Sequence, residues 1–177
     1  YEEKIYNATR ASGSLYNKDY IGTTISAEYQ EKNYTIATGI DYFDGERIDN
    51  TNLGTTTKDN LAIFFESQLQ PDWLPKNMGL SVGFRHEEVD YTHSDAAANH
   101  STDESLNAWD VGLNYEVNSQ LSFFGNINHA YQAPDIDRSF VGVWESSAPF
   151  AFIRRDFNGF IEPSKVDTLN LEIGRAH

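Results

Sequence analysis

Two adjacent arginines stand among aromatic residues in the polar stretch that runs from Val143 to Phe160. Arginine donates charge-assisted hydrogen bonds to anions and stacks on aromatic rings. These residue types together favour an anionic, partly aromatic ligand. The sequence therefore predicts a ligand-binding site composed of Trp144, Arg154, Arg155 and Phe157. The alternative is that the rings pack this stretch onto its neighbours while the arginines pair with Asp135, Asp137 or Asp156.

The other reactive side chains do not form a recognisable site. His86, His93 and His100 recur at a spacing of seven residues, which matches no common set of metal ligands. Glu87 and Glu88 are adjacent, so in a strand their carboxylates point to opposite faces. The chain has no cysteine, no phosphate-binding glycine loop and no nucleophile elbow. We therefore predict no metal site, no catalytic residue, no enzymatic activity and no cofactor.

The composition points to a protein whose strands are apolar on one face only. The net charge of -14 repels phosphates, so a nucleic-acid partner is excluded. Aromatic residues make up 14% of the chain, yet its mean hydropathy is -0.57. A membrane β-barrel combines these values, because its outer face is apolar and fringed with aromatic rings while its lumen and loops are polar.

Apolar and polar residues alternate with a period of two, the pattern of a strand with two different faces. In residues 106–117, Trp109, Val111 and Leu113 share one face, and the residues between them, such as Asp110 and Gly112, share the other. The same alternation occurs in Asn33–Asp44, Asn77–Glu87 and Leu121–Tyr131. Weaker strands are predicted at Ile5–Tyr16, Tyr20–Gln30, Lys58–Leu69 and Val166–Arg175.

These windows predict an all-β fold of about eight antiparallel strands in an up-and-down meander. Strands of about 10 to 14 residues exceed the usual length in soluble sheets and suffice to cross a bilayer. The connections alternate between short turns and the long polar stretches Asp44–Thr57, Asp90–Ser105 and Gln132–Lys165. Outer-membrane barrels alternate short periplasmic turns with long outer loops. Asn17–Asp19 departs from this pattern, because it is short where an outer loop is expected.

Two short motifs near the C-terminal end carry a resemblance to a known family. The run Tyr131-Gln-Ala-Pro-Asp135 ends one strand, and Ile161-Glu-Pro-Ser-Lys165 precedes the next. This pair, with the loop between its members, resembles the barrel of TonB-dependent outer-membrane receptors. The matching positions are Ala133, Pro134, Glu162 and Pro163, although Gln132 replaces the usual arginine and Glu162-Pro163 reverses the usual order.

The resemblance implies that residues 1–177 are a single segment of a transmembrane barrel of about 22 strands. It implies a receptor in the bacterial outer membrane, in contact with lipid, that binds and imports a ferric siderophore or similar iron chelate. Such a receptor works with TonB through a plug domain, and we expect neither plug nor TonB-contacting segment within this fragment. Two alternatives remain open: a complete eight-stranded barrel acting as an adhesin or anchor, and a soluble β-sandwich binding domain.

Overall fold

The structure is a computed structural model that describes residues 2–10, 13–49, 54–145 and 152–174; side chains are described for residues 16–49, 54–142 and 156–174. Its strands are β1 (Glu2–Arg10), β2 (Gly13–Glu31), β3 (Tyr34–Asp49), β4 (Gly54–Leu69), β5 (Met78–Ser94), β6 (Asn99–Asn118), β7 (Leu121–Gln132), β8 (Phe140–Glu145), β9 (Phe152–Phe157) and β10 (Ser164–Gly174). A short 3₁₀ helix, η1 (Ile136–Ser139), precedes β8. No helix among these residues is long and apolar enough to cross a membrane.

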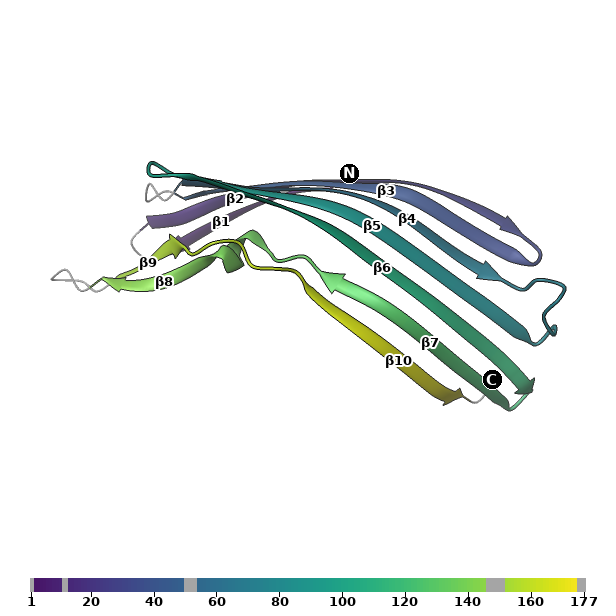
Figure 1. The fold of residues 1–177 in the computed structure, drawn as a ribbon. Helices are drawn as coiled ribbons and strands as arrows, with labels where there is room; N and C mark the ends of the chain where they lie inside the picture. The colour runs from purple at the N-terminus through teal and green to yellow at the C-terminus, as the bar shows by residue number, and fades with distance from the viewer. Residues whose placement is uncertain (1, 11–12, 50–53, 146–151, 175–177) are drawn as a thin grey trace.

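Eight of the strands form one antiparallel sheet in the order β1-β2-β3-β4-β5-β6-β7-β10, which confirms the predicted meander. The sheet curves into a single arched wall (Figure 1). Within the described ranges β1 and β10 are its two edges and are not neighbours, which argues against a closed eight-stranded barrel. A single layer of this shape is also not a sandwich of two packed sheets.

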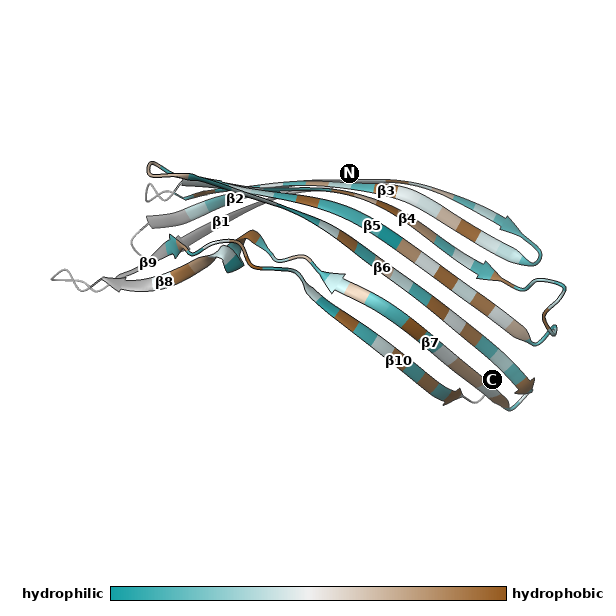
Figure 2. Ribbon diagram, viewed as in Figure 1, coloured by the Kyte–Doolittle hydropathy of each residue, from teal (hydrophilic) through white to brown (hydrophobic). Residues whose placement is uncertain are grey.

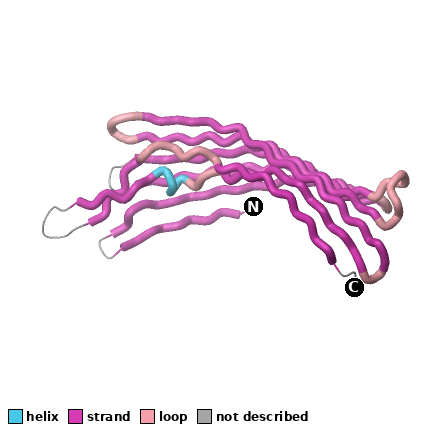
Figure 3. The backbone as a smooth tube through the Cα atoms, turned by 60° about the horizontal axis from the view of Figure 1, so that its bottom comes forward, coloured by secondary structure: helices cyan, strands magenta, loops and turns pink. Residues whose placement is uncertain are grey.

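The meander is interrupted once, by the segment 133–163, which we call the excursion. It leaves the wall after Gln132 and returns at Ser164, and these two residues are register partners in the β7–β10 ladder. The excursion contains η1 and a separate hairpin, β8–β9. Figure 3 shows this hairpin lying within the trough formed by the curved wall, on its concave side.

Several polar stretches predicted as loops are strands in the structure. β3 and β4 are paired as far as Asp49 and Gly54, and β5 and β6 as far as Ser94 and Asn99. The predicted strand Ile5–Tyr16 is likewise wrong, because β1 ends at Arg10 and β2, which includes Asn17–Asp19, begins at Gly13. Backbone hydrogen bonds hold two strands together even where both faces are polar. A strand can therefore extend beyond the residues whose apolar alternation predicts it.

The two faces of the wall differ as the alternation predicts. Cross-strand partners Phe84 and Trp109, Val82 and Val111, and Leu80 and Leu113 lie on the face away from the hairpin. Figure 2 shows the resulting alternation of brown and teal along β4, β5, β6, β7 and β10. Together with the equivalent outward residues of the other strands, these positions form what we call the apolar band, which lies toward the short-turn end of the wall. A band of this kind is the part of a barrel that meets hydrocarbon.

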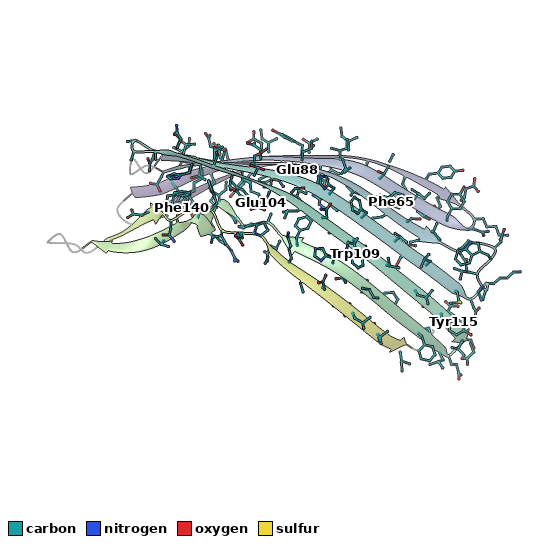
Figure 4. All side chains as sticks on the ribbon, viewed as in Figure 1. Phe65, Glu88, Glu104, Trp109, Tyr115 and Phe140 are labelled. Atoms are coloured by element: carbon teal, nitrogen blue, oxygen red, sulfur yellow. The ribbon has the colours of Figure 1, made fainter. Side chains whose placement is uncertain are left out.

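Beyond the apolar band, the outward face carries an acidic row. Asp44, Asp59, Asp90 and Asp103 are successive register partners across β3 to β6. Partial burial raises the pKa of Asp59, and the neighbouring carboxylates of Asp44 and Asp90 raise it further. Like charges directly opposite each other are unfavourable in a sheet. The row therefore marks the end of the apolar band on the outward face. Glu88, which lies near this level, is on the convex side in Figure 4.

The excursion covers a small apolar core on the concave face. Val89, Tyr91 and Leu106 are buried there, and Tyr131, Ala133 and Phe160 pack against them. Elsewhere the sheet has little core of its own, because its apolar band faces outward. Contacts with the concave face of the wall therefore hold the excursion in position.

Candidate ligand-binding site

The Ala133-Pro134 motif turns the chain from the wall onto the concave face. Ala133 packs against the apolar core, and Pro134 is buried. The carbonyl oxygen of Pro134 accepts hydrogen bonds from Lys58 Nζ at 3.2 Å and from the Tyr91 hydroxyl at 2.9 Å. Both donors belong to the wall, so this carbonyl fixes the start of the excursion against β4 and β5.

The next turn is held by acidic side chains. Asp135 caps η1, because its carboxylate accepts a hydrogen bond from the Asp137 backbone N–H at 3.1 Å. The same carboxylate lies 3.4 Å from Lys18 Nζ on β2. Burial opposes ionisation of Asp135, but the backbone donor and the Lys18 ammonium outweigh it and lower the pKa of this carboxyl. Asp137 also pairs with Lys18.

Arg47 of β3 is the most deeply enclosed cation among the described side chains of the wall, with 1% of its surface exposed. Its guanidinium lies 2.8 Å from the Asp137 carboxylate and 3.4 Å from that of Asp49. It is also sandwiched between two rings, with its central carbon 4.3 Å from the Tyr16 centroid and 3.8 Å from the Phe140 centroid. Charge pairing and cation–π contact thus join β2 and β3 to the excursion.

His93 of β5 forms the seat of the β8–β9 hairpin. Its Nδ1 is 2.8 Å from the Thr56 hydroxyl oxygen. Its ring stacks on Phe157 at 4.0 Å between centroids and meets the ring of Phe140 nearly edge-on at 5.7 Å. Burial lowers the pKa of His93, which outweighs the opposite influence of Asp95. Figure 4 shows Phe140 beneath the wall, where this seat lies.

The structure places the predicted ligand residues at different levels of the hairpin. Phe157 lies at its base, against His93. Trp144 pairs with Ile153 in the hairpin ladder, and Arg154 and Arg155 pair with Val143 and Gly142, but the side chains of all three predicted residues are outside the described set. Glu162 and Pro163 precede β10 and complete the return to the wall, with Glu162 exposed.

An open pocket of about 770 Å³ lies between the wall and the beginning of the excursion. The wall contributes the rings of Tyr20 and Phe43, the Lys58 ammonium and the space over Gly22; the excursion contributes Ala133 and the turn from Asp135 to Arg138. This volume is in the usual range for small-molecule sites. Sequence reasoning missed the pocket, because Lys58 and Arg138 are far apart in the chain and neither lies in a motif.

The three histidines do not form one cluster, because His86 lies apart from His93 and His100. His86 faces outward, with Nε2 3.0 Å from Glu88 and Nδ1 2.9 Å from the Asn107 side-chain oxygen. His93 faces the hairpin, and the ring of His100 is 6.4 Å from it. Within the described part of the chain, no group of three or more histidine or carboxylate side chains could hold a metal ion.

Below the pocket, the concave face carries a network of one cation and two carboxylates. Arg85 pairs with Asp41 and lies 3.2 Å from Glu87. The Tyr131 hydroxyl joins it, donating to Glu87 and lying 3.1 Å from Arg85 Nε. Arg85 is therefore paired with two carboxylates at this level. The pocket above differs, because no described carboxylate forms an ion pair with its cations Lys58 and Arg138.

The family model described as TonB dependent receptor-like, β-barrel matches residues 2–173. The chain therefore belongs to this family, whose members are outer-membrane receptors. It is 29% identical to the TonB-dependent heme receptor A of Haemophilus influenzae, over an alignment of 98 residues that covers 49% of this chain and 13% of that protein. It thus spans about an eighth of that relative's length.

Two solved structures were compared with this chain. The copper transporter OprC superposes with a TM-score of 0.68 and 14% identity over 89% of this chain and 27% of its own. The ferric yersiniabactin uptake receptor FyuA of Yersinia pestis gives a TM-score of 0.49 and 12% identity over 90% of this chain and 26% of its own. The likeness to the first of these confirms the barrel-wall fold.

Proposed function

We propose that this chain is a barrel segment of a receptor that binds and imports a ferric siderophore or a similar anionic iron chelate. The observation that carries the proposal is the docked excursion, which forms a pocket on the concave face lined by Lys58, Arg138, Asp135 and Asp137. Among the described side chains, the two carboxylates pair with wall cations, whereas Lys58 and Arg138 have no carboxylate partner within 4 Å. The similarity to a TonB-dependent heme receptor supports an iron chelate as the cargo.

The rest of the machinery follows from family membership. In the proposal, residues 1–177 form one segment of a larger barrel that has about 22 strands in total. The apolar band meets the lipid of the bacterial outer membrane, and the concave face borders the lumen. A plug domain elsewhere in the receptor would connect the bound ligand to TonB. The chain acts here by binding and positioning a ligand, not by catalysis.

The hairpin contributes at two levels in this proposal. Phe157 anchors its base through the stack on His93. Trp144, Arg154 and Arg155 provide stacking and charge-assisted hydrogen bonds to the chelate, a role based on their residue types. The pocket beside η1 holds another part of the same ligand.

Growth on defined iron sources tests the function. The gene of the whole receptor is deleted and restored in its native host, and uptake of radioactive iron is measured from ferric citrate, hemin, a ferric tris-catecholate and a neutral ferric tris-hydroxamate. We expect the deletion to abolish TonB-dependent uptake from an anionic chelate and the restored gene to recover it. Equal uptake from every source with and without the gene contradicts the proposal.

A further inference from the structure

Lys58 and Arg138 differ from the other cations on the concave side because no described carboxylate pairs with them. Lys18 pairs with Asp135 and Asp137, Arg47 with Asp49 and Asp137, and Arg85 with Asp41 and Glu87. Among the described side chains, Lys58 and Arg138 have no such ion pair, although the chain carries 27 acidic residues against 13 lysines and arginines. Both line the pocket beside η1.

Lys58 is held in place rather than free to leave the pocket. Its ammonium donates to the Pro134 carbonyl at 3.2 Å and lies over the rings of Phe43 at 5.9 Å and Tyr91 at 5.5 Å. Burial lowers its pKa, and the more distant charges of Glu87 and Asp135 offset this only in part. A half-buried ammonium with one carbonyl partner retains donors for an anion.

The remaining surface of the pocket suits a flat group. The rings of Tyr20 and Phe43 lie 5.5 Å apart and form one side. Gly22 leaves open space between them and the excursion, since a Cβ atom there would meet no atom within 4 Å. The carboxylates of Asp135 and Asp137 also border the pocket, but they pair with Lys18 and Arg47 of the wall.

We infer that this pocket binds a planar anionic group of the imported ligand, a carboxylate or a catecholate, with Lys58 and Arg138 as hydrogen-bond donors and the Phe43 ring beside it. The inference rests on the proposed function and narrows it, because it excludes neutral chelates as the preferred cargo. It also assigns specificity to wall residues that lie outside the hairpin.

The test uses the full-length receptor purified in detergent, with binding measured by quenching of tryptophan fluorescence. The probes are ferric citrate, hemin and a ferric tris-catecholate, with a neutral ferric tris-hydroxamate for comparison. Lys58→Gln removes the charge but keeps a donor for the Pro134 carbonyl, and Arg138→Gln changes an exposed side chain. Each substitution should weaken binding of the preferred anionic chelate by about tenfold or more, as expected for loss of a charged hydrogen bond.

A steric variant tests the same pocket without altering charge. Gly22→Phe fills the open space and should also weaken binding by at least about tenfold. Gly79→Phe is its matched control, because a Cβ atom at Gly79 also meets no atom within 4 Å, and Gly79 lies on the same face but near the short turns. Lys32→Gln, in an exposed turn, is the control for lost charge. Both controls should bind as the wild type does.

The outcomes separate the two proposals. If the wild type binds a chelate and the pocket variants bind it equally well, or if the neutral tris-hydroxamate is preferred, the pocket assignment is overturned while the receptor function stands. If the wild type binds none of the probes and deletion of its gene leaves iron uptake unchanged, the proposed function is overturned and the inference with it.

Discussion

Replacement of Asp137 by asparagine should release the excursion from the wall. The Asp137 carboxylate lies 2.8 Å from Arg47 and also pairs with Lys18, so Asp137→Asn weakens two charge-assisted contacts at once. Hydrogen bonds to charged groups contribute about 1.5–3 kcal/mol each. Because the Asp137 side chain is 30% exposed, the lower end of this range applies, and docking should lose about 3 kcal/mol.

A buried thiol can report this change directly. The chain has no cysteine, and Ser139 is buried at 3% exposure where η1 meets β8, so Ser139→Cys introduces a thiol that reacts only when the excursion opens. A loss of about 3 kcal/mol raises the open fraction, and hence the maleimide labelling rate, by about 150-fold. Asp103→Asn on the outward face should leave the rate unchanged. Equal labelling of Asp137→Asn and the parent would refute the assignment of this docking contact.

Three other changes probe the backbone, the hairpin seat and the orientation of the wall. Gly54→Ala should destabilise the receptor by about 1–3 kcal/mol, seen as a lower thermal midpoint, because φ is 94° and the new Cβ would lie 2.1 Å from the Ser94 carbonyl oxygen. Burial holds the pKa of His93 below 6.5. The full docking free energy is therefore present above this pH, and it decreases as the pH falls through the lowered pKa. In the Ser139→Cys background, His93→Phe should remove this pH dependence of thiol labelling. Leu113→Arg, in the apolar band, should cost about 2–4 kcal/mol and reduce receptor in the outer-membrane fraction, while Asn114→Arg is tolerated.

The controls for these changes come from the same structure. Gly22→Ala, at an open position, should leave the thermal midpoint the same or slightly higher, and an equal loss at both glycines would contradict the role of the positive φ. Labelling rates at each pH are normalised to those of the denatured protein. If the pH dependence of labelling persists in His93→Phe, a group other than His93 is responsible for it. Equal membrane yields for the Leu113 and Asn114 variants would contradict the assignment of the two faces.

The strands nearest the short turns could be predicted from sequence because their two faces meet different surroundings. The Trp109–Leu113 alternation is an example, and the structure confirms its shared face. Beyond the apolar band both faces are polar, so no periodicity distinguishes the strand ends around Asp49 and Ser94 from loops. Their pairing depends on the backbone ladder, which the side-chain pattern does not encode.

The docking of the excursion could not be predicted for a different reason. Arg47 and Asp137 are 90 residues apart, and an acidic chain offers many possible partners for each cation. The sequence suggested Asp135 and Asp137 as partners for the hairpin arginines, whereas their described partners are Lys18 and Arg47 on the wall. These pairs form because the curvature of the wall brings β2 and β3 against η1.

The adjacency of Gln132 and Ser164 has a consequence for how such receptors diversify. Since these residues face each other in one ladder, a foreign segment joined at the same two points would leave every strand in register. Cargo preference can then be exchanged as a cassette while the lipid-facing surface stays constant. A graft would still need acidic groups placed to meet Lys18 and Arg47, because the wall retains those cations whatever is inserted.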